Sequence, residues 1–170
     1  AISPREQHSK LRIFIGVNVA RSVYKGTDIM LAAAQDIAKK YPDTVELRIA
    51  QSVPFAEYQK LMEHSDVVLD QLYSYTPAMN ALLAMSKGIV CVGGGEPECY
   101  EILHEEHLHP IVNVQPTYES VYSELERLAL HPELIPRLKE ESMAFICKHH
   151  DYLKVAQQYE KFYAGSLKEQ

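Results

Sequence analysis

The 170-residue sequence contains no tryptophan and only three cysteines, Cys91, Cys99 and Cys147. Three scattered cysteines are too few for a disulfide framework, and this usage is typical of a reducing compartment. No apolar run approaches the roughly 20 residues with which a helix crosses a bilayer. The polar residues 1–10 also lack the apolar core of a signal peptide. We therefore expect a cytoplasmic protein.

An excess of positive charge is missing as well. Lysines and arginines number 17 against 23 aspartates and glutamates, which gives a formal net charge of -6. Proteins that bind nucleic acids or membrane surfaces usually present a basic face, so we expect no nucleic-acid partner. The apolar fraction of 46% is ordinary for a globular protein, and the length suits one domain.

Short apolar runs alternate with amphipathic stretches along most of the chain. Runs rich in β-branched residues predict strands, and apolar residues repeated at helical spacing predict helices. The expected strands are 11–17, 45–50, 67–72, 89–92 and 111–114, and the expected helices are 27–41, 54–64, 76–86, 97–103, 117–130, 132–149 and 151–163. This order predicts an α/β fold, a Rossmann-like doubly wound parallel sheet with helices on both faces and the C-terminal helices packed alongside.

Ligands of such sheets bind beyond the carboxyl ends of the strands. The loop after the first strand carries Arg21 and Lys25 ahead of Gly26. A guanidinium and an ammonium in one loop can both reach one anionic group, because arginine binds phosphate oxygens in a bidentate manner and lysine adds a point charge. The alternative is a solvated loop with two ordinary surface cations.

The segment 73–80 joins the third strand to an apolar helix and contains small side chains at the helix start. Open backbone N–H groups at the positive end of a helix dipole form an anion site. Alternatively, Thr76 caps the helix and nothing binds there.

Three consecutive glycines, Gly93, Gly94 and Gly95, follow the fourth strand. Glycine lets a ligand approach the backbone closely, and the carboxylates of Glu96 and Glu98 can accept hydrogen bonds from sugar or ribose hydroxyls. The alternative is a flexible turn in which the two glutamates favour a helix start. The segment is not a P-loop, because no Gly-Lys-Ser/Thr follows it.

The residues indicate neither a metal site nor a catalytic nucleophile. His104, His107 and His109 match no standard zinc-binding spacing, so we expect no metal and no other cofactor. The cysteines have no recognisable nucleophile context, and no Gly-x-Ser-x-Gly elbow occurs. The catalytic residues therefore stay unassigned.

The order and spacing of these segments resemble GT-B glycosyltransferases of group 1, similar to family 4. Arg21 followed by Lys25-Gly26-Thr27-Asp28 is similar to their R…KG-x-D segment. Segments 58–69, 83–90, 93–102 and 155–163 resemble later motifs of these enzymes in the same order, so that the likeness covers roughly 11–163.

The resemblance implies the C-terminal domain, which holds the nucleotide-sugar donor, at 11–163, between a linker at 1–10 and a tail at 164–170. It implies a hexosyltransferase of polysaccharide biosynthesis that retains anomeric configuration, needs no metal and transfers a sugar to a glycan or lipid-linked acceptor. The acceptor-binding N-terminal half would lie outside this chain. The isolated domain would then be inactive, and contact with the inner face of a membrane would come through that half.

The resemblance also assigns residues to parts of the donor. Arg21 and Lys25 would bind the diphosphate together with the amides of Ala78, Met79 and Asn80. The base would lie near Val53, Pro54 and Tyr58, and the sugar or ribose near Tyr75, Gly94, Glu96 and Glu98.

One departure from the family concerns its two glutamates in an E-x7-E pattern. The corresponding positions here are Tyr75 and Leu83, and neither side chain can act as a carboxylate. A non-catalytic module that binds nucleotide sugars or a partner on the same fold therefore stays open. A sugar 2-epimerase on this fold would need catalytic acids near the cleft.

Overall fold

Short runs of β-branched and other apolar residues form five strands. The structure, a computed structural model, describes residues 10–166. The strands pair in parallel throughout, in the order β2-β1-β3-β4-β5. They are β1 (Leu11–Val17), β2 (Val45–Gln51), β3 (Val67–Leu69), β4 (Val90–Gly93) and β5 (Val112–Asn113). Of these, β1, β3 and β4 are largely buried on both faces, as is usual for parallel sheets, whereas the edge strand β2 is mostly half-buried or exposed.

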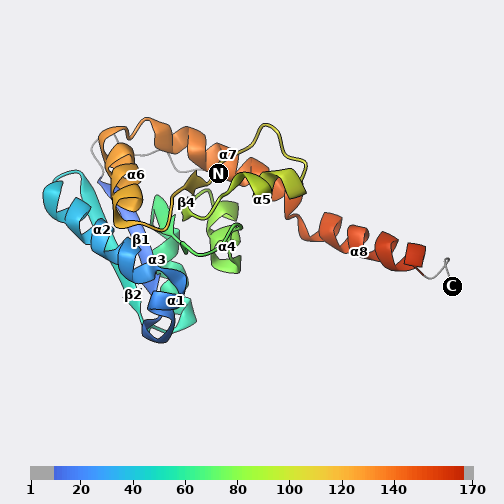
Figure 1. The fold of residues 1–170 in the computed structure, drawn as a ribbon, viewed down its shortest axis with the longest axis horizontal. Helices are drawn as coiled ribbons and strands as arrows, with labels where there is room; N and C mark the ends of the chain where they lie inside the picture. The colour runs from blue at the N-terminus through green and yellow to red at the C-terminus, as the bar shows by residue number, and fades with distance from the viewer. Residues whose placement is uncertain (1–9, 167–170) are drawn as a thin grey trace.

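Helices connect the strands and complete the chain (Figure 1). They are the 3-10 turn η1 (Val19–Arg21), α1 (Ser22–Lys25), α2 (Thr27–Lys40), α3 (Phe55–Glu63), α4 (Met79–Ser86), α5 (Pro97–Ile102), α6 (Tyr118–Leu130), α7 (Leu134–His149) and α8 (Tyr152–Ser166).

Each face of the sheet carries its own apolar core. Neighbouring side chains of a strand point to opposite faces, so Ile13 and Ile15 of β1 pack with α2 and α6 through residues such as Met30 and Leu125. Phe14 points the other way and packs with residues of α3, α4 and α7. Helices thus cover both faces, and the predicted doubly wound α/β fold is confirmed.

The structure differs from the prediction most where the strands end. The strand predicted at 67–72 ends at Leu69, and the helix predicted at 76–86 begins at Met79. The loop after β1, which carried no predicted helix, folds into η1 and α1. These segments lie beyond the carboxyl ends of β1 and β3. Their conformation depends on contacts with other loops, which leave no periodic pattern of apolar residues in the sequence.

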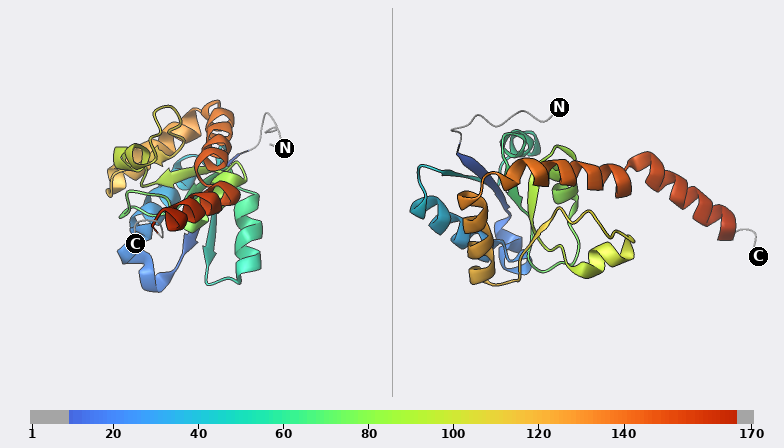
Figure 2. Two further views of the ribbon diagram at one scale, coloured as in Figure 1. Left: turned by 90° about the vertical axis from the view of Figure 1, so that its right-hand side faces the viewer. Right: turned by 90° about the horizontal axis from the view of Figure 1, so that it is seen from above.

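The C-terminal helices differ from one another in their packing. The packing alongside the sheet is confirmed for α6 and α7, whereas α8 extends away from the body (Figures 1 and 2). Tyr152 and Tyr159 on α8 are 77% and 60% exposed. None of the described helices is both long and apolar enough to cross a membrane.

The predicted ends of the domain fall near the limits of the described residues. Of the linker predicted at 1–10, residues 1–9 lie outside the described residues. In the tail predicted at 164–170, residues 164–166 continue α8, and the rest lie outside the described residues.

A buried carboxylate at the amino end of β3 ties the sheet to α7. The fully buried Asp66 accepts hydrogen bonds from Arg12 Nε at 3.0 Å and from Lys139 Nζ at 2.7 Å. Burial raises the pKa of Asp66, but the bonds from Arg12 and Lys139 outweigh it and bring the pKa to about 2. The charge of Asp66 therefore stabilises the fold at neutral pH.

Asp66→Asn is expected to lower the free energy of unfolding by about 3 kcal/mol, because two cations lose a buried partner. Wild-type stability from this group is fully present above the unfolded pKa near 3.8 and declines as the pH falls toward about 2, since protonation breaks both ion pairs. Urea unfolding at pH 7 and at acid pH measures both effects.

Asp43→Asn serves as the matched control, because Asp43 is exposed in the turn before β2. It should change stability by no more than about 0.5 kcal/mol. Equal stability of the two variants would contradict a structural role for the Asp66 charge.

Candidate functional site

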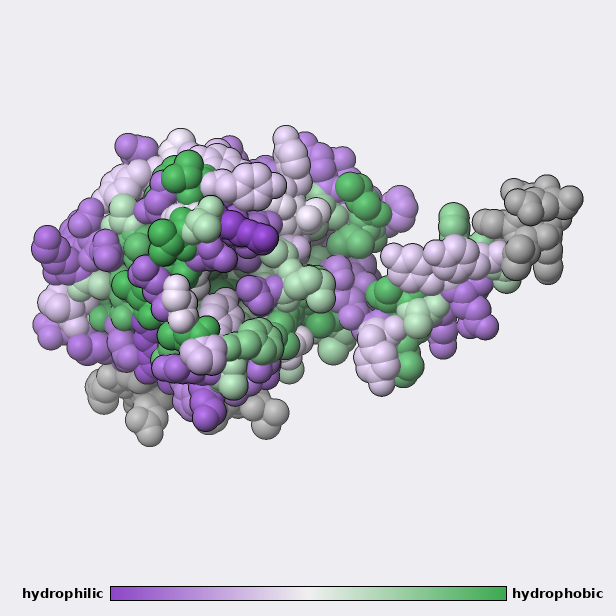
Figure 3. Space-filling model, turned by 90° about the horizontal axis from the view of Figure 1, so that it is seen from below, coloured by the Kyte–Doolittle hydropathy of each residue, from purple (hydrophilic) through white to green (hydrophobic). Residues whose placement is uncertain are grey.

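A cleft of about 400 Å³ opens at the carboxyl ends of β1, β2 and β3. The sheet order reverses between β1 and β3, and such a reversal is where open α/β sheets bind ligands. The volume lies within the usual range for small-molecule sites. Figure 3 views the molecule from below, the side on which α1 lies in Figure 1, and shows apolar and polar side chains mixed over this face.

The cleft brings together residues that the sequence places in four separate loops or helix starts. The predicted residues that line it are Arg21, Lys25, Val53, Tyr58 and Asn80. Groups proposed for the diphosphate and for the base therefore share one cleft.

The loop after β1 owes its shape to Gly26. This residue has a φ of 71°, in the left-handed region that favours glycine. A Cβ on Gly26 would also lie 2.9 Å from side-chain atoms of Leu72. The N–H of Leu72 donates to the carbonyl of Lys25 at 2.9 Å, so the loops after β1 and β3 are joined directly at the cleft.

The start of α4 differs from the prediction of an open helix end. Thr76 does not cap it, because the helix begins at Met79 with Ala78 as the N-cap residue. The N–H of Ala78, predicted to bind phosphate, donates to Oδ2 of Asp70 at 3.0 Å. The Met79 side chain is 80% exposed and does not line the cleft, whereas Asn80 does.

Asp70 is the charged lining residue that sequence reasoning missed. It falls within the strand predicted at 67–72, but β3 ends at Leu69, so Asp70 follows the strand and lines the cleft. Burial raises the pKa of Asp70, while the Ala78 N–H and the positive charge of Lys25 act in the opposite direction. The sequence signal that could have identified Asp70 is a carboxylate directly after a strand that borders a topological switch point.

Tyr58 forms the aromatic wall of the cleft. Its ring packs edge-on against Phe14 with centroids 5.0 Å apart and stacks with Phe55 at 6.4 Å. A Cβ on Gly16 would lie 2.5 Å from Cε2 of Tyr58, so glycine makes room for the ring. Pro54 lies outside the lining, and its carbonyl accepts from the N–H groups of Glu57 and Tyr58 as α3 begins.

A second cavity, of about 420 Å³, contains two of the residues predicted for the sugar or ribose. Tyr75 and Glu96 line it together with Tyr73 and Gln115. Gln115 Nε2 donates to Glu96 Oε1 at 3.2 Å. The predicted site is therefore divided between two cavities. Glu98 lies exposed in the first turn of α5 and lines neither of them.

The glycine run after β4 contacts protein where a ligand was expected. A Cβ on Gly94 would lie 1.6 Å from the carbonyl oxygen of Ser74, and one on Gly95 would lie 2.7 Å from Ile111. The N–H of Gly94 donates to Gln71, and that of Gly95 donates to Asn113. The glycines thus let the loops after β3 and β4 pack together.

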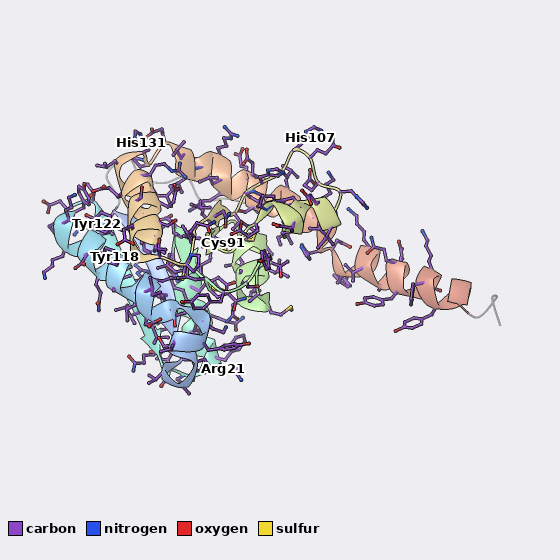
Figure 4. All side chains as sticks on the ribbon, in the orientation of Figure 1. Arg21, Cys91, His107, Tyr118, Tyr122 and His131 are labelled. Carbon is purple, nitrogen blue, oxygen red and sulfur yellow. The ribbon has the colours of Figure 1, made fainter. Side chains whose placement is uncertain are left out.

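The histidines lie apart from the cleft. Figure 4 shows Arg21 at the α1 end of the molecule and His107 at the opposite side. Among residues 10–166, no group of three or more histidine, cysteine or acidic side chains has a geometry that could hold a metal ion.

Comparisons in sequence and in structure give different results. No family model matches the chain, and no curated protein matches it in sequence. Solved structures match across most of its length. They include GT-B glycosyltransferases and a UDP-GlcNAc 2-epimerase from Neisseria meningitidis, which matches with a TM-score of 0.53 and 16% identity over 79% of this chain and 39% of that one.

A C-terminal domain of a group 1 glycosyltransferase, LpcC from Francisella tularensis, matches with a TM-score of 0.59 and 15% identity over 83% of this chain and 86% of that one. HepE from Anabaena, in complex with UDP and glucose, matches with a TM-score of 0.63 and 13% identity over 92% of this chain and 48% of that one. The pneumococcal O-GlcNAc transferase GtfA, in complex with UDP and GlcNAc, matches with a TM-score of 0.64 and 10% identity over 92% of this chain and 36% of that one. The chain thus has the Rossmann-like fold of these enzymes and spans less than half of HepE and GtfA.

Gly94→Ala is expected to destabilise the protein by at least about 2 kcal/mol, because the new methyl group meets the Ser74 carbonyl and forces the loops after β3 and β4 apart. Thermal unfolding followed by circular dichroism measures the loss. The matched control is Gly165→Ala on α8, where a Cβ meets nothing within 4 Å. If Gly94→Ala and Gly165→Ala had the same melting temperature, the contact between the two loops would be shown not to stabilise the protein.

Proposed function

We propose that this chain is the donor-binding half of a glycosyltransferase that uses a nucleotide-diphosphate sugar. The observation that carries the proposal is the cleft at the switch point of the sheet, which Arg21 and Lys25 line together with Asn80 of α4. Two cations and the positive end of a helix dipole are suited to a pyrophosphate. The fold shared with enzymes solved in complex with UDP supports the same ligand class.

The base of the nucleotide would lie against Tyr58 and Val53, which form the apolar part of the same cleft. The sugar or ribose would reach toward Tyr75 and Glu96 in the second cavity. Phosphate binding would rest on the two cations without a metal, and the reaction would retain anomeric configuration.

The acceptor, a glycan or a lipid-linked saccharide, would bind a second half outside this chain. The chain covers 36% of GtfA and 48% of HepE, which leaves room in such proteins for that half. The isolated chain would then bind the donor without turning it over.

A non-catalytic module that binds nucleotide sugars is the second candidate. The observation that favours it is the absence of carboxylates at Tyr75 and Leu83, and Leu83 of α4 packs against the apolar core. Sugar transfer by a protein that contains this chain together with its acceptor half would exclude this alternative.

The chain is expected to bind nucleoside diphosphates with micromolar affinity, about 8 kcal/mol, as the two cations, the α4 amides and base packing together allow. Thermal-shift measurements with the diphosphates of uridine, guanosine and adenosine, and with their sugars, test this directly. A bound ligand raises the melting temperature by an amount that grows with concentration. No shift with any of these ligands would overturn the proposal.

Lys25→Ala is expected to weaken uridine diphosphate binding by at least about 1.5 kcal/mol, because a charge-assisted bond to phosphate is lost. The loss should be smaller for uridine monophosphate, and isothermal titration calorimetry measures both. Lys39→Ala, an exposed lysine on α2 outside the cleft, is the matched control. Equal binding of the mono- and diphosphate by the wild type would show that the phosphate assignment is wrong.

A further inference from the structure

Asp70 introduces a negative charge into a cleft otherwise suited to an anion. Among the described residues that line the cleft it is the acidic one, beside the cations Arg21 and Lys25. A carboxylate at this position works against a negatively charged ligand.

The Asp70 carboxylate already accepts a backbone hydrogen bond that a phosphate at the start of α4 would use. Its Oδ2 accepts the Ala78 N–H at 3.0 Å, at the helix end where a phosphate would bind. Lys25 lines the same cleft, and its positive charge lowers the pKa of Asp70 against the larger effect of burial, which raises that pKa. Asp70 thus acts toward the start of α4 as a bound anion would.

We propose that Asp70 is an internal substitute for phosphate, and that a nucleoside diphosphate entering the cleft takes over its partners while the Asp70 carboxylate takes up a proton. This inference rests on the proposed function and adds a regulatory property to that site. The affinity for the diphosphate then increases as the pH falls, because a neutral Asp70 no longer opposes the ligand.

The other ionisable groups around Asp70 come from four elements. Arg21 of η1 and Lys25 of α1 supply positive charge to the cleft. Burial raises the pKa of Tyr58 on α3 and of Cys91 on β4, and the charge of Asp70 raises both further, so both stay neutral near pH 7. The carboxylate is therefore the group in this cluster whose protonation changes with ligand binding.

Asp70→Asn tests the proposal while keeping the fold, because an asparagine Oδ1 can still accept the Ala78 N–H as an N-cap side chain does. Calorimetry with uridine diphosphate, and with pyrophosphate as a probe without base or ribose, is performed between about pH 5 and 8. Near pH 8 the Asp70→Asn variant should bind the diphosphate about tenfold more tightly than the wild type does. The difference in affinity should become smaller as the pH falls.

Proton uptake provides the second readout. Titrations at one pH in buffers of different ionisation enthalpy should show more protons taken up by the wild type than by Asp70→Asn. The diphosphate has its own titration near pH 6, which is common to both proteins and cancels in the comparison. Asp70→Ser, which also offers an N-cap oxygen, repeats the test should the asparagine variant fold poorly.

Asp43→Asn removes one negative charge far from the cleft and should bind like the wild type. Wild-type binding without excess proton uptake, or an unchanged or weaker affinity of both Asp70 variants, would overturn the role of Asp70 and leave the donor-binding function intact. Absence of binding by the wild type and both variants would overturn the proposed function and this inference together.

Discussion

The position of β1 between β2 and β3 is the constraint on which the rest of this structure depends. β1 pairs with β2 along one edge and with β3 along the other, so the chain must leave their carboxyl ends in diverging directions. The loops after β1 and β3 therefore border an open space that no strand fills. The bond from Leu72 to the carbonyl of Lys25 and the close contact of Gly26 with Leu72 then set the width of this space.

Within that space the structure pairs charges that oppose one another. Arg21 and Lys25 attract an anion, whereas Asp70 supplies one from the protein itself. A helix start leaves N–H groups that need acceptors, and in α4 the Asp70 carboxylate serves one of them at Ala78. A polar group that stabilises the empty protein is thus also the group that a negatively charged ligand must overcome.

The loops after β3 and β4 show that a glycine run required for packing can resemble a ligand-binding motif. Three glycines after a strand are typical of backbone that approaches a ligand, yet Gly94 lies against the Ser74 carbonyl and Gly95 against Ile111. The loop that carries Tyr75 is held in place by this contact. Gly94 thus packs against Ser74, and Ser74 lines the second cavity together with Tyr75 and Glu96.

Local patterns in the sequence determined the number, order and type of the main helices and strands, because burial on one or both faces leaves a periodic record in the chain. They also indicated Arg21 and Lys25, and the family resemblance added Val53, Tyr58 and Asn80. The fold gathers all five in one cleft. Only the tertiary structure decided that β3 ends before Asp70, that α4 begins at Met79 and that Glu98 lies apart. Those outcomes depend on contacts within one loop, such as Asp70 with Ala78, and between loops, such as Gly94 with Ser74. Such contacts leave no periodic signal in the residues that make them.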